Sequence, residues 1–270
     1  LFLFLAAPSV DPVNWEPFMP FGFSGVSAGA AVIVFAYLGV DSIATAAEET
    51  KNPAHDMPTG IIASLLICTV LYIAVTAVMT GNVPYTELDN AEPVAFVLRQ
   101  LGYRFGSALV GTGAIAGLTT VLLVMMYAQT RAFFAMSRDG LIPQSICKVH
   151  PHFATPHRIT IIVGLAVAVI SGFTPINVIA EMCSVGTLFA FIVSSVGVMI
   201  MRKKYPDLAR PFRCPAIYVV GTLAIASCGY IMYNLSSMTW ERFWVWSALG
   251  ILVYFLYGYR HSRENKQGEA

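Results

Sequence analysis

The sequence predicts an all-α integral membrane protein with seven transmembrane spans, and three observations lead to this prediction. Of its 270 residues, 57% are hydrophobic and only 11% are charged, whereas an ordinary soluble domain has about 25% charged residues. Mean hydropathy is +0.69. The apolar residues form long runs separated by turn-forming stretches, as in a chain that crosses a bilayer repeatedly.

The same composition excludes several classes of protein. A water-soluble enzyme, a disordered chain and a collagen-like chain do not fit it. The net charge of +1 provides no basic field for a nucleic acid, so no nucleic-acid partner is expected. The five cysteines and five histidines show no Cys-x-x-Cys or His-x-x-x-His spacing, and we expect neither a metal nor another cofactor.

The chain opens with a short apolar run, residues 1–7, which ends at Pro8. Seven residues are too few to cross a bilayer, which takes about 20, and no basic region precedes them as in a signal peptide. We therefore expect residues 1–7 to be the end of a truncated transmembrane helix and the chain to be a fragment. Residues 8–23 contain no Lys or Arg and are predicted to be an extracellular loop.

Seven long apolar segments follow, each long enough, or nearly so, to cross about 30 Å of hydrocarbon. Five of them fill residues 24–201, a cytoplasmic loop occupies 202–217, two more lie within 218–259, and residues 260–270 form a cytoplasmic tail. The predicted spans are Ser24–Ala47, Pro58–Thr80, Phe105–Met136, Ile159–Gly172, Val178–Met201, Tyr218–Leu235 and Phe243–Tyr259. A short helix, Pro93–Leu101, is expected in the loop before the third span, because proline suits a first helical turn.

The basic residues predict the orientation of these spans. Thirteen of the 16 Lys and Arg residues fall on one side of the predicted bilayer, and Arg99, Arg104 and Arg242 fall on the other. The richer side is cytoplasmic by the positive-inside rule. The chain is therefore predicted to begin outside and to end inside.

The first span contains two residues that are costly at membrane depth. Gly39 costs a helix interior about 1 kcal/mol relative to alanine, and a carboxylate such as Asp41 costs at least about 2.5 kcal/mol. Both are explained if the helix is interrupted near Gly39, leaving free carbonyls around residues 35–38 that suit an ammonium group. The alternative is a continuous helix with a packing glycine. Asp41, with Ser42 beside it, is either a cap of the inner half-helix or a direct participant in proton or substrate binding.

Charged residues at the cytoplasmic face and at the outer end of the fifth span have more than one interpretation. Glu49 and Arg131 could form a cytoplasmic gate, or they could belong to a solvated, pairing surface. Glu181 begins the fifth span near the outer face, where a carboxylate costs little.

Two motifs resemble a known family. The segment Phe35–Ser42 (FAYLGVDS), followed by Ala46–Pro53 (AAEETKNP), is similar to the sixth helix of the amino acid–polyamine–organocation (APC) superfamily. Within that superfamily, the chain resembles the branch formed by the bacterial relatives of the cationic amino acid transporters. Tyr127–Arg131 and Ala135–Pro143 are similar to the end of that family's eighth helix and the following loop. One departure is Val40, where the family often has phenylalanine.

The resemblance implies a LeuT-type fold with two inverted five-helix repeats and two extra helices. The seven spans would then be helices six to twelve: the second inverted repeat plus the two extra helices, with the first repeat missing. Main-chain carbonyls of Phe35, Ala36 and Leu38 would bind the substrate α-ammonium group. The substrate-binding residues expected on this basis are Phe35, Ala36, Tyr37, Leu38 and Gly39.

The function expected from the residues and the resemblance is a secondary active amino acid permease that works by alternating access in the plasma membrane. Its partners would be an L-amino acid, the lipid bilayer, protons as the coupling ion, and the missing N-terminal helices of the same polypeptide. By itself the fragment is expected to be inactive. The alternatives are a seven-helix receptor, which shares the topology but lacks receptor motifs, and an intramembrane enzyme, for which no catalytic pair is found in the spans.

Overall fold

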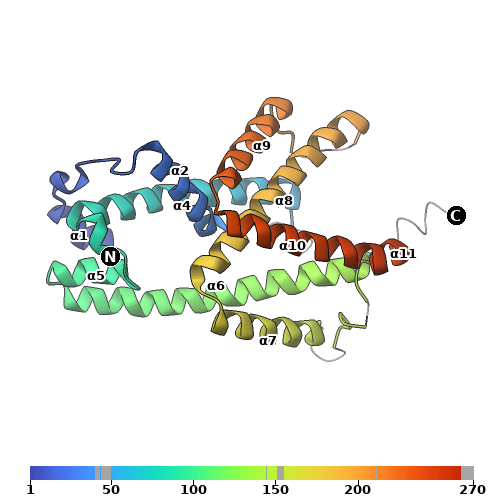
Figure 1. The fold of residues 1–270 in the computed structure, drawn as a ribbon, viewed down its shortest axis with the longest axis horizontal. Helices are drawn as coiled ribbons and strands as arrows, with labels where there is room; N and C mark the ends of the chain where they lie inside the picture. Colours follow the sequence, from blue (N-terminus) through green and yellow to red (C-terminus); the bar gives the residue numbers. More distant parts are fainter. Residues whose placement is uncertain are drawn as a thin grey trace. The chain divides into compact units, whose positions relative to one another are not determined.

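A computed structural model describes residues 1–39, 43, 50–143, 145–150, 155–208, 210 and 212–262. Within these ranges all regular structure is helical and no strand occurs (Figure 1). The chain divides into two compact units, one formed by Leu1–Val26 with Pro58–Val124 and the other by Ser27–Met57 with Met125–Ala270. Each unit has a hydrophobic core of its own.

The first unit combines short helices with parts of three longer ones. Its core consists of Phe2, Ala6, Val83, Val97 and Leu98. The elements are α1 (Phe2–Ala6), η1 (Ala7–Ser9), η2 (Pro12–Trp15), the start of α2 (Gly22–Ile33), most of α4 (Pro53–Asn82), η5 (Tyr85–Glu87), α5 (Pro93–Gln100) and the start of α6 (Arg104–Arg138).

The loop that precedes α2 is fixed to the end of α4. The Trp15 indole donates to Thr80 Oγ1 at 3.2 Å, and the Asn14 side chain donates to the Gly81 carbonyl at 2.9 Å. A Cβ atom on Gly81 would lie 2.7 Å from Val10 Cγ1, so this close approach requires glycine.

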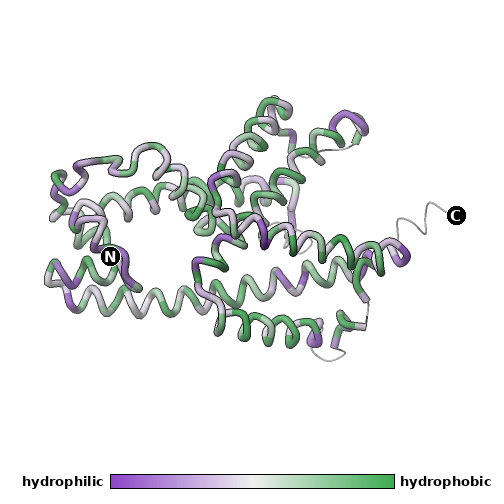
Figure 2. Tube along the Cα trace, viewed as in Figure 1, coloured by the Kyte–Doolittle hydropathy of each residue, from purple (hydrophilic) through white to green (hydrophobic). Residues whose placement is uncertain are grey.

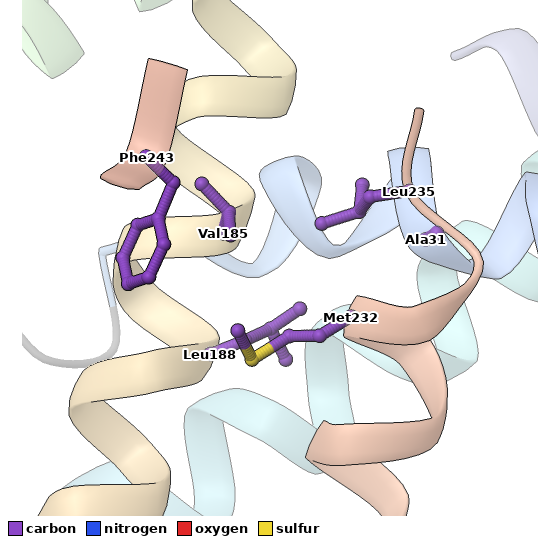
Figure 3. Close-up of a cluster of buried hydrophobic side chains, with 6 residues drawn as sticks. All are labelled: Ala31, Val185, Leu188, Met232, Leu235 and Phe243. Atoms are coloured by element: carbon purple, nitrogen blue, oxygen red, sulfur yellow. The ribbon is translucent and has the colours of Figure 1, made fainter. Parts of the chain in front are cut away.

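The second unit contains the rest of α2 and α6 and all the later helices. Its main core joins four helices through Ala31 of α2, Val185 and Leu188 of α8, Met232 of α9 and Phe243 of α10, with Leu235 beside them (Figure 3). The further elements are η3 (Val34–Tyr37), α7 (His157–Phe173), α8 (Ile176–Lys204), α9 (Ile217–Tyr233), α10 (Ser237–Val253), η6, a π-helical turn (Tyr254–Gly258), and α11 (Tyr259–His261). Within this unit α8 and α9 lie side by side (Figure 1).

Three helices of the described chain are long and apolar enough to cross a membrane by themselves, namely α4, α6 and α8. The helices Ile217–Tyr233 and Ser237–His261 pass the same test as a pair bent by 115°, and α2–η3 and α7 are apolar but shorter. Apolar residues run along most of each helix (Figure 2), and many stay exposed, such as Leu66 at 63% and Val70 at 65%. Helices that are apolar all round and unburied are typical of a bilayer environment.

The helices lie where the apolar runs predict them. Each of the seven predicted segments contains helical residues, and the predicted loop helix Pro93–Leu101 is α5, Pro93–Gln100. An all-helical protein with several apolar helices is therefore confirmed. Seven spans, their orientation, the residue limits of the loops and the inverted repeat stay predictions.

Candidate functional site

Within the first predicted span, the helical structure that begins at Gly22 ends just before Gly39. Its α-helix ends at Ile33, a 3₁₀ turn continues through Tyr37, and Leu38 is extended with ψ 136°. Gly39 has φ +120°, a conformation that side chains of L-residues rarely adopt. A Cβ atom there would also lie 3.1 Å from Cε of Met125 on α6. The break therefore requires glycine for its backbone angle, and a Cβ atom there would also displace the Met125 methyl group by a few tenths of an ångström.

The 3₁₀ turn changes the expected pattern of carbonyls. Free carbonyls were expected around residues 35–38, but the Leu38 N–H donates to the Phe35 carbonyl at 3.2 Å. The expectation is therefore wrong for Phe35, because the chain tightens into a 3₁₀ turn before it breaks. A carbonyl oxygen has two lone pairs, so a bonded carbonyl retains a second acceptor position.

The N-terminal half of the broken helix is held by α8 and α9. Ala31 is 1% exposed within the core of the second unit, and Val34 packs against that core. The Ser27 and Tyr230 hydroxyls lie 2.6 Å apart, and either can donate. Sequence reasoning missed Tyr230 because it lies 203 residues from Ser27; the only signal was a serine within an apolar run.

The other predicted site residues are only partly placed. Asp41, Ser42 and Glu49 lie outside the described residues, as does Val40. Arg131 is on α6, and its guanidinium carbon lies 4.5 Å from the centroid of the Tyr127 ring, a cation–π contact. The gate formed by Glu49 and Arg131 and the role of Asp41 thus stay hypotheses.

A second polar cluster joins the N-terminal ends of α8 and α10. The Glu181 carboxylate accepts hydrogen bonds from Ser236 Oγ at 2.6 Å and from Thr239 Oγ1. Thr239 is completely buried. Glu181 is therefore not simply an interfacial carboxylate in solvent, since it ties two helices together. Sequence reasoning missed both partners because they lie 55 and 58 residues away.

A titratable pair lies outside the predicted spans. Arg99 Nη2, in the last turn of α5, donates to Oε1 of Glu92, the residue that precedes the helix, at 2.9 Å. This hydrogen bond and the positive charge of Arg99 lower the pKa of Glu92. Both side chains are exposed, so the pair is a surface feature. Across the described ranges, no group of three or more His, Cys, Asp or Glu side chains is placed to hold a metal ion.

Comparisons with known proteins identify the family of the chain. A family profile described as "Amino acid permease" matches residues 1–256. The chain is 47% identical over 267 residues to the branched-chain amino acid permease BcaP of Bacillus subtilis (strain 168), covering 98% of this chain and 57% of that protein. The methylthioribose transporter of the same organism is 47% identical over 266 residues, covering 98% and 58%.

A plant protein is also similar. The chain is 33% identical over 318 residues to the chloroplastic cationic amino acid transporter 9 of Arabidopsis thaliana, covering 94% of this chain and 56% of that protein. The chain thus spans less than two thirds of the length of these three relatives. All three are named as permeases or transporters, in agreement with the prediction of a protein that is not an enzyme.

Proposed function

We propose, since this chain belongs to the amino acid permease family, that the protein carrying it is a secondary active transporter of L-amino acids in the plasma membrane. Transport would follow alternating access, with the broken first helix serving both binding and gating. The chain spans 57% of the length of the B. subtilis permease, so further helices would complete the pathway. By itself the 270-residue chain is proposed to be inactive.

The observation that carries this proposal is the helix break at Gly39, with its φ of +120°. The preceding helical turns end in carbonyls at the negative end of the helix dipole, and an ammonium group offers three donors. We place the substrate α-ammonium group at the carbonyls of Phe35, Ala36 and Leu38. The absence of a side chain on Gly39 lets the substrate approach the backbone, with Tyr37 next to it.

The coupling and gating residues complete the proposal. Asp41 and Ser42 would cap the inner half-helix, or Asp41 would take part in proton coupling. Glu49 and Arg131 would close the cytoplasmic side. If Asp41 is a cap, the Asp41→Asn variant should keep part of its uptake. If Asp41 takes part in proton coupling, the same variant should lose the pH dependence of uptake.

Uptake into proteoliposomes tests the proposed function. The full-length protein that carries this chain should accumulate labelled L-amino acids from a panel of aliphatic and cationic side chains. The 270-residue chain reconstituted alone is the comparison, and it should give only background uptake. Failure of the full-length protein with the whole panel, under both a proton gradient and counter-substrate loading, would overturn the proposal and favour a receptor or another non-transport role.

One observation favours a second candidate substrate. The methylthioribose transporter is as similar to this chain, at 47%, as the branched-chain amino acid permease is. Methylthioribose has hydroxyl donors but no α-ammonium group. Uptake of labelled leucine and of labelled methylthioribose, measured separately, distinguishes the two: an amino acid site takes up leucine and not methylthioribose, whereas a methylthioribose site takes up methylthioribose and not leucine.

A further inference from the structure

We propose that the C-terminal end of α8 and the described residues of the turn that leads to α9, all within residues 202–217, bind the headgroup of an anionic phospholipid in the cytoplasmic leaflet. We name this segment the basic turn. It contains five basic residues and one acidic residue, Asp207, for a net charge of +4. A positive-inside bias alone explains why basic residues gather here, but it does not explain how the structure divides them into two groups.

The first group shapes the turn. The Arg210 guanidinium donates to the carbonyl of Met201 at 3.2 Å, of Pro206 at 3.0 Å and of Leu208 at 3.1 Å, and also to the carbonyl of Tyr205. It thereby satisfies carbonyls at the C-terminal end of α8.

Arg202 closes the other side of the turn by donating to the Cys214 carbonyl at 3.3 Å. Arg202 and Arg210, two of the five cations, thus donate hydrogen bonds to backbone carbonyls of this segment.

The second group consists of Lys203, Lys204 and Arg213, which are exposed. Among the described residues none of these three forms an ion pair. Three cations held on a short turn raise the local positive potential, and the compensating charge has to come from outside the turn. Such basic clusters directly cytoplasmic of a spanning helix attract anionic lipid headgroups.

Exposed apolar side chains identify the anion as part of a lipid. Tyr205, Leu208 and Phe212 are 50%, 51% and 52% exposed, and Lys204 Nζ lies 5.5 Å from the centroid of the Tyr205 ring. Aromatic and basic side chains interleaved at a helix end are typical of the membrane interface. A soluble phosphate would need the cations but not the three apolar neighbours.

The length of α8 places the basic turn at headgroup depth. Its 29 residues extend about 43 Å at 1.5 Å per residue, more than the roughly 30 Å of hydrocarbon. The helix therefore reaches the polar region of the bilayer, and a hydrophilic stretch marks its end in Figure 2.

Lipid binding measured by native mass spectrometry tests the proposal. The full-length protein is titrated in detergent with dioleoyl phosphatidylglycerol and, separately, with dioleoyl phosphatidylcholine. The variant Lys203→Gln, Lys204→Gln, Arg213→Gln should lose about 100-fold in affinity for phosphatidylglycerol at low salt, since each basic residue near an anionic surface contributes about fivefold. The matched control Lys51→Gln, Lys148→Gln, Arg260→Gln removes equal charge from other exposed positions and should stay within threefold.

Three results would overturn the proposal: equal affinity of the variant and the unmodified protein, equal losses in the variant and the control, or displacement of the lipid by glycerol 3-phosphate at similar concentration. If the triple variant is not monodisperse, Leu208→Ser with Phe212→Ser provides a second test, because it should weaken phosphatidylglycerol binding while all charges remain. The readout is lipid binding itself, so its outcome is independent of whether the protein transports amino acids.

Discussion

The first predicted span and α6 are both glycine-containing, apolar helices, yet one breaks and the other does not. α6 continues for 35 residues through Gly111, Gly113 and Gly117, none of which has a positive φ, whereas Gly39 has φ +120°. A Cβ atom would meet nothing within 4 Å at these three glycines, but it would lie 3.1 Å from Met125 Cε at Gly39 and 2.8 Å from Leu5 Cδ1 at Gly106, the fourth glycine of α6. Glycine and a close neighbour therefore permit a break and do not by themselves cause one.

The largest effect should come from adding one methyl group at Gly39. Alanine at φ +120° is strained by about 1–3 kcal/mol, so Gly39→Ala should reduce amino acid uptake by at least tenfold while the protein still inserts. Gly113→Ala is the matched control, which should keep uptake and gain helix stability of up to about 1 kcal/mol. Equal uptake by the Gly39→Ala and Gly113→Ala variants in proteoliposomes would contradict the view that glycine is needed in the first predicted span but not in α6.

The next effect should come from the core that holds the N-terminal half of the broken helix. Ala31 is 1% exposed, so Ala31→Leu overpacks the cluster and should cost about 1–3 kcal/mol of unfolding free energy. Ala28→Leu adds the same atoms at an exposed position of the same helix. Thermal unfolding in detergent compares the stabilities of the two variants. If Ala28→Leu were as unstable as Ala31→Leu, the packing argument would be contradicted.

A smaller effect is expected from the hydrogen bond between Ser27 and Tyr230. Bonds of this kind between membrane helices contribute about 0.6 kcal/mol on average. Ser27→Ala and Tyr230→Phe should each lose about that much, and the double variant should lose no more than either alone. Tyr233→Phe, at an 82% exposed position of the same helix, should change nothing; additive losses in the double-mutant cycle would argue against the bond.

The smallest effect should appear at Glu92, on the loop helix that precedes α6. Arg99 lowers the pKa of Glu92 in the folded state, so the pair stabilises the fold above the unfolded pKa of about 4.3 and loses this contribution as the pH falls through the lowered value. The melting temperatures of Glu92→Gln and the unmodified protein should therefore differ slightly near pH 7 and converge at low pH. A difference that grows on acidification would contradict this assignment.

The sequence predicted the positions of helices and the break near Gly39, because hydropathy and glycine placement are local properties. The resemblance to the APC superfamily, read from Phe35–Ser42 and the end of α6, is confirmed. What the sequence could not provide depends on distant partners. The α-helix changes to a 3₁₀ turn after Ile33, and Ser27 and Glu181 bond to residues far along the chain. The basic turn is a further example, because nothing in the local sequence distinguishes Arg210 from its solvent-facing neighbours.

The bond between Ser27 and Tyr230 also has a mechanical consequence. Together with Ala31 in the core, it holds the N-terminal half of the broken helix against α9. This attachment ends where the backbone leaves the helix, at the extended Leu38 and at Gly39 with its φ of +120°. Any transport step that moved this half away from α9 would have to break the hydrogen bond and expose Ala31.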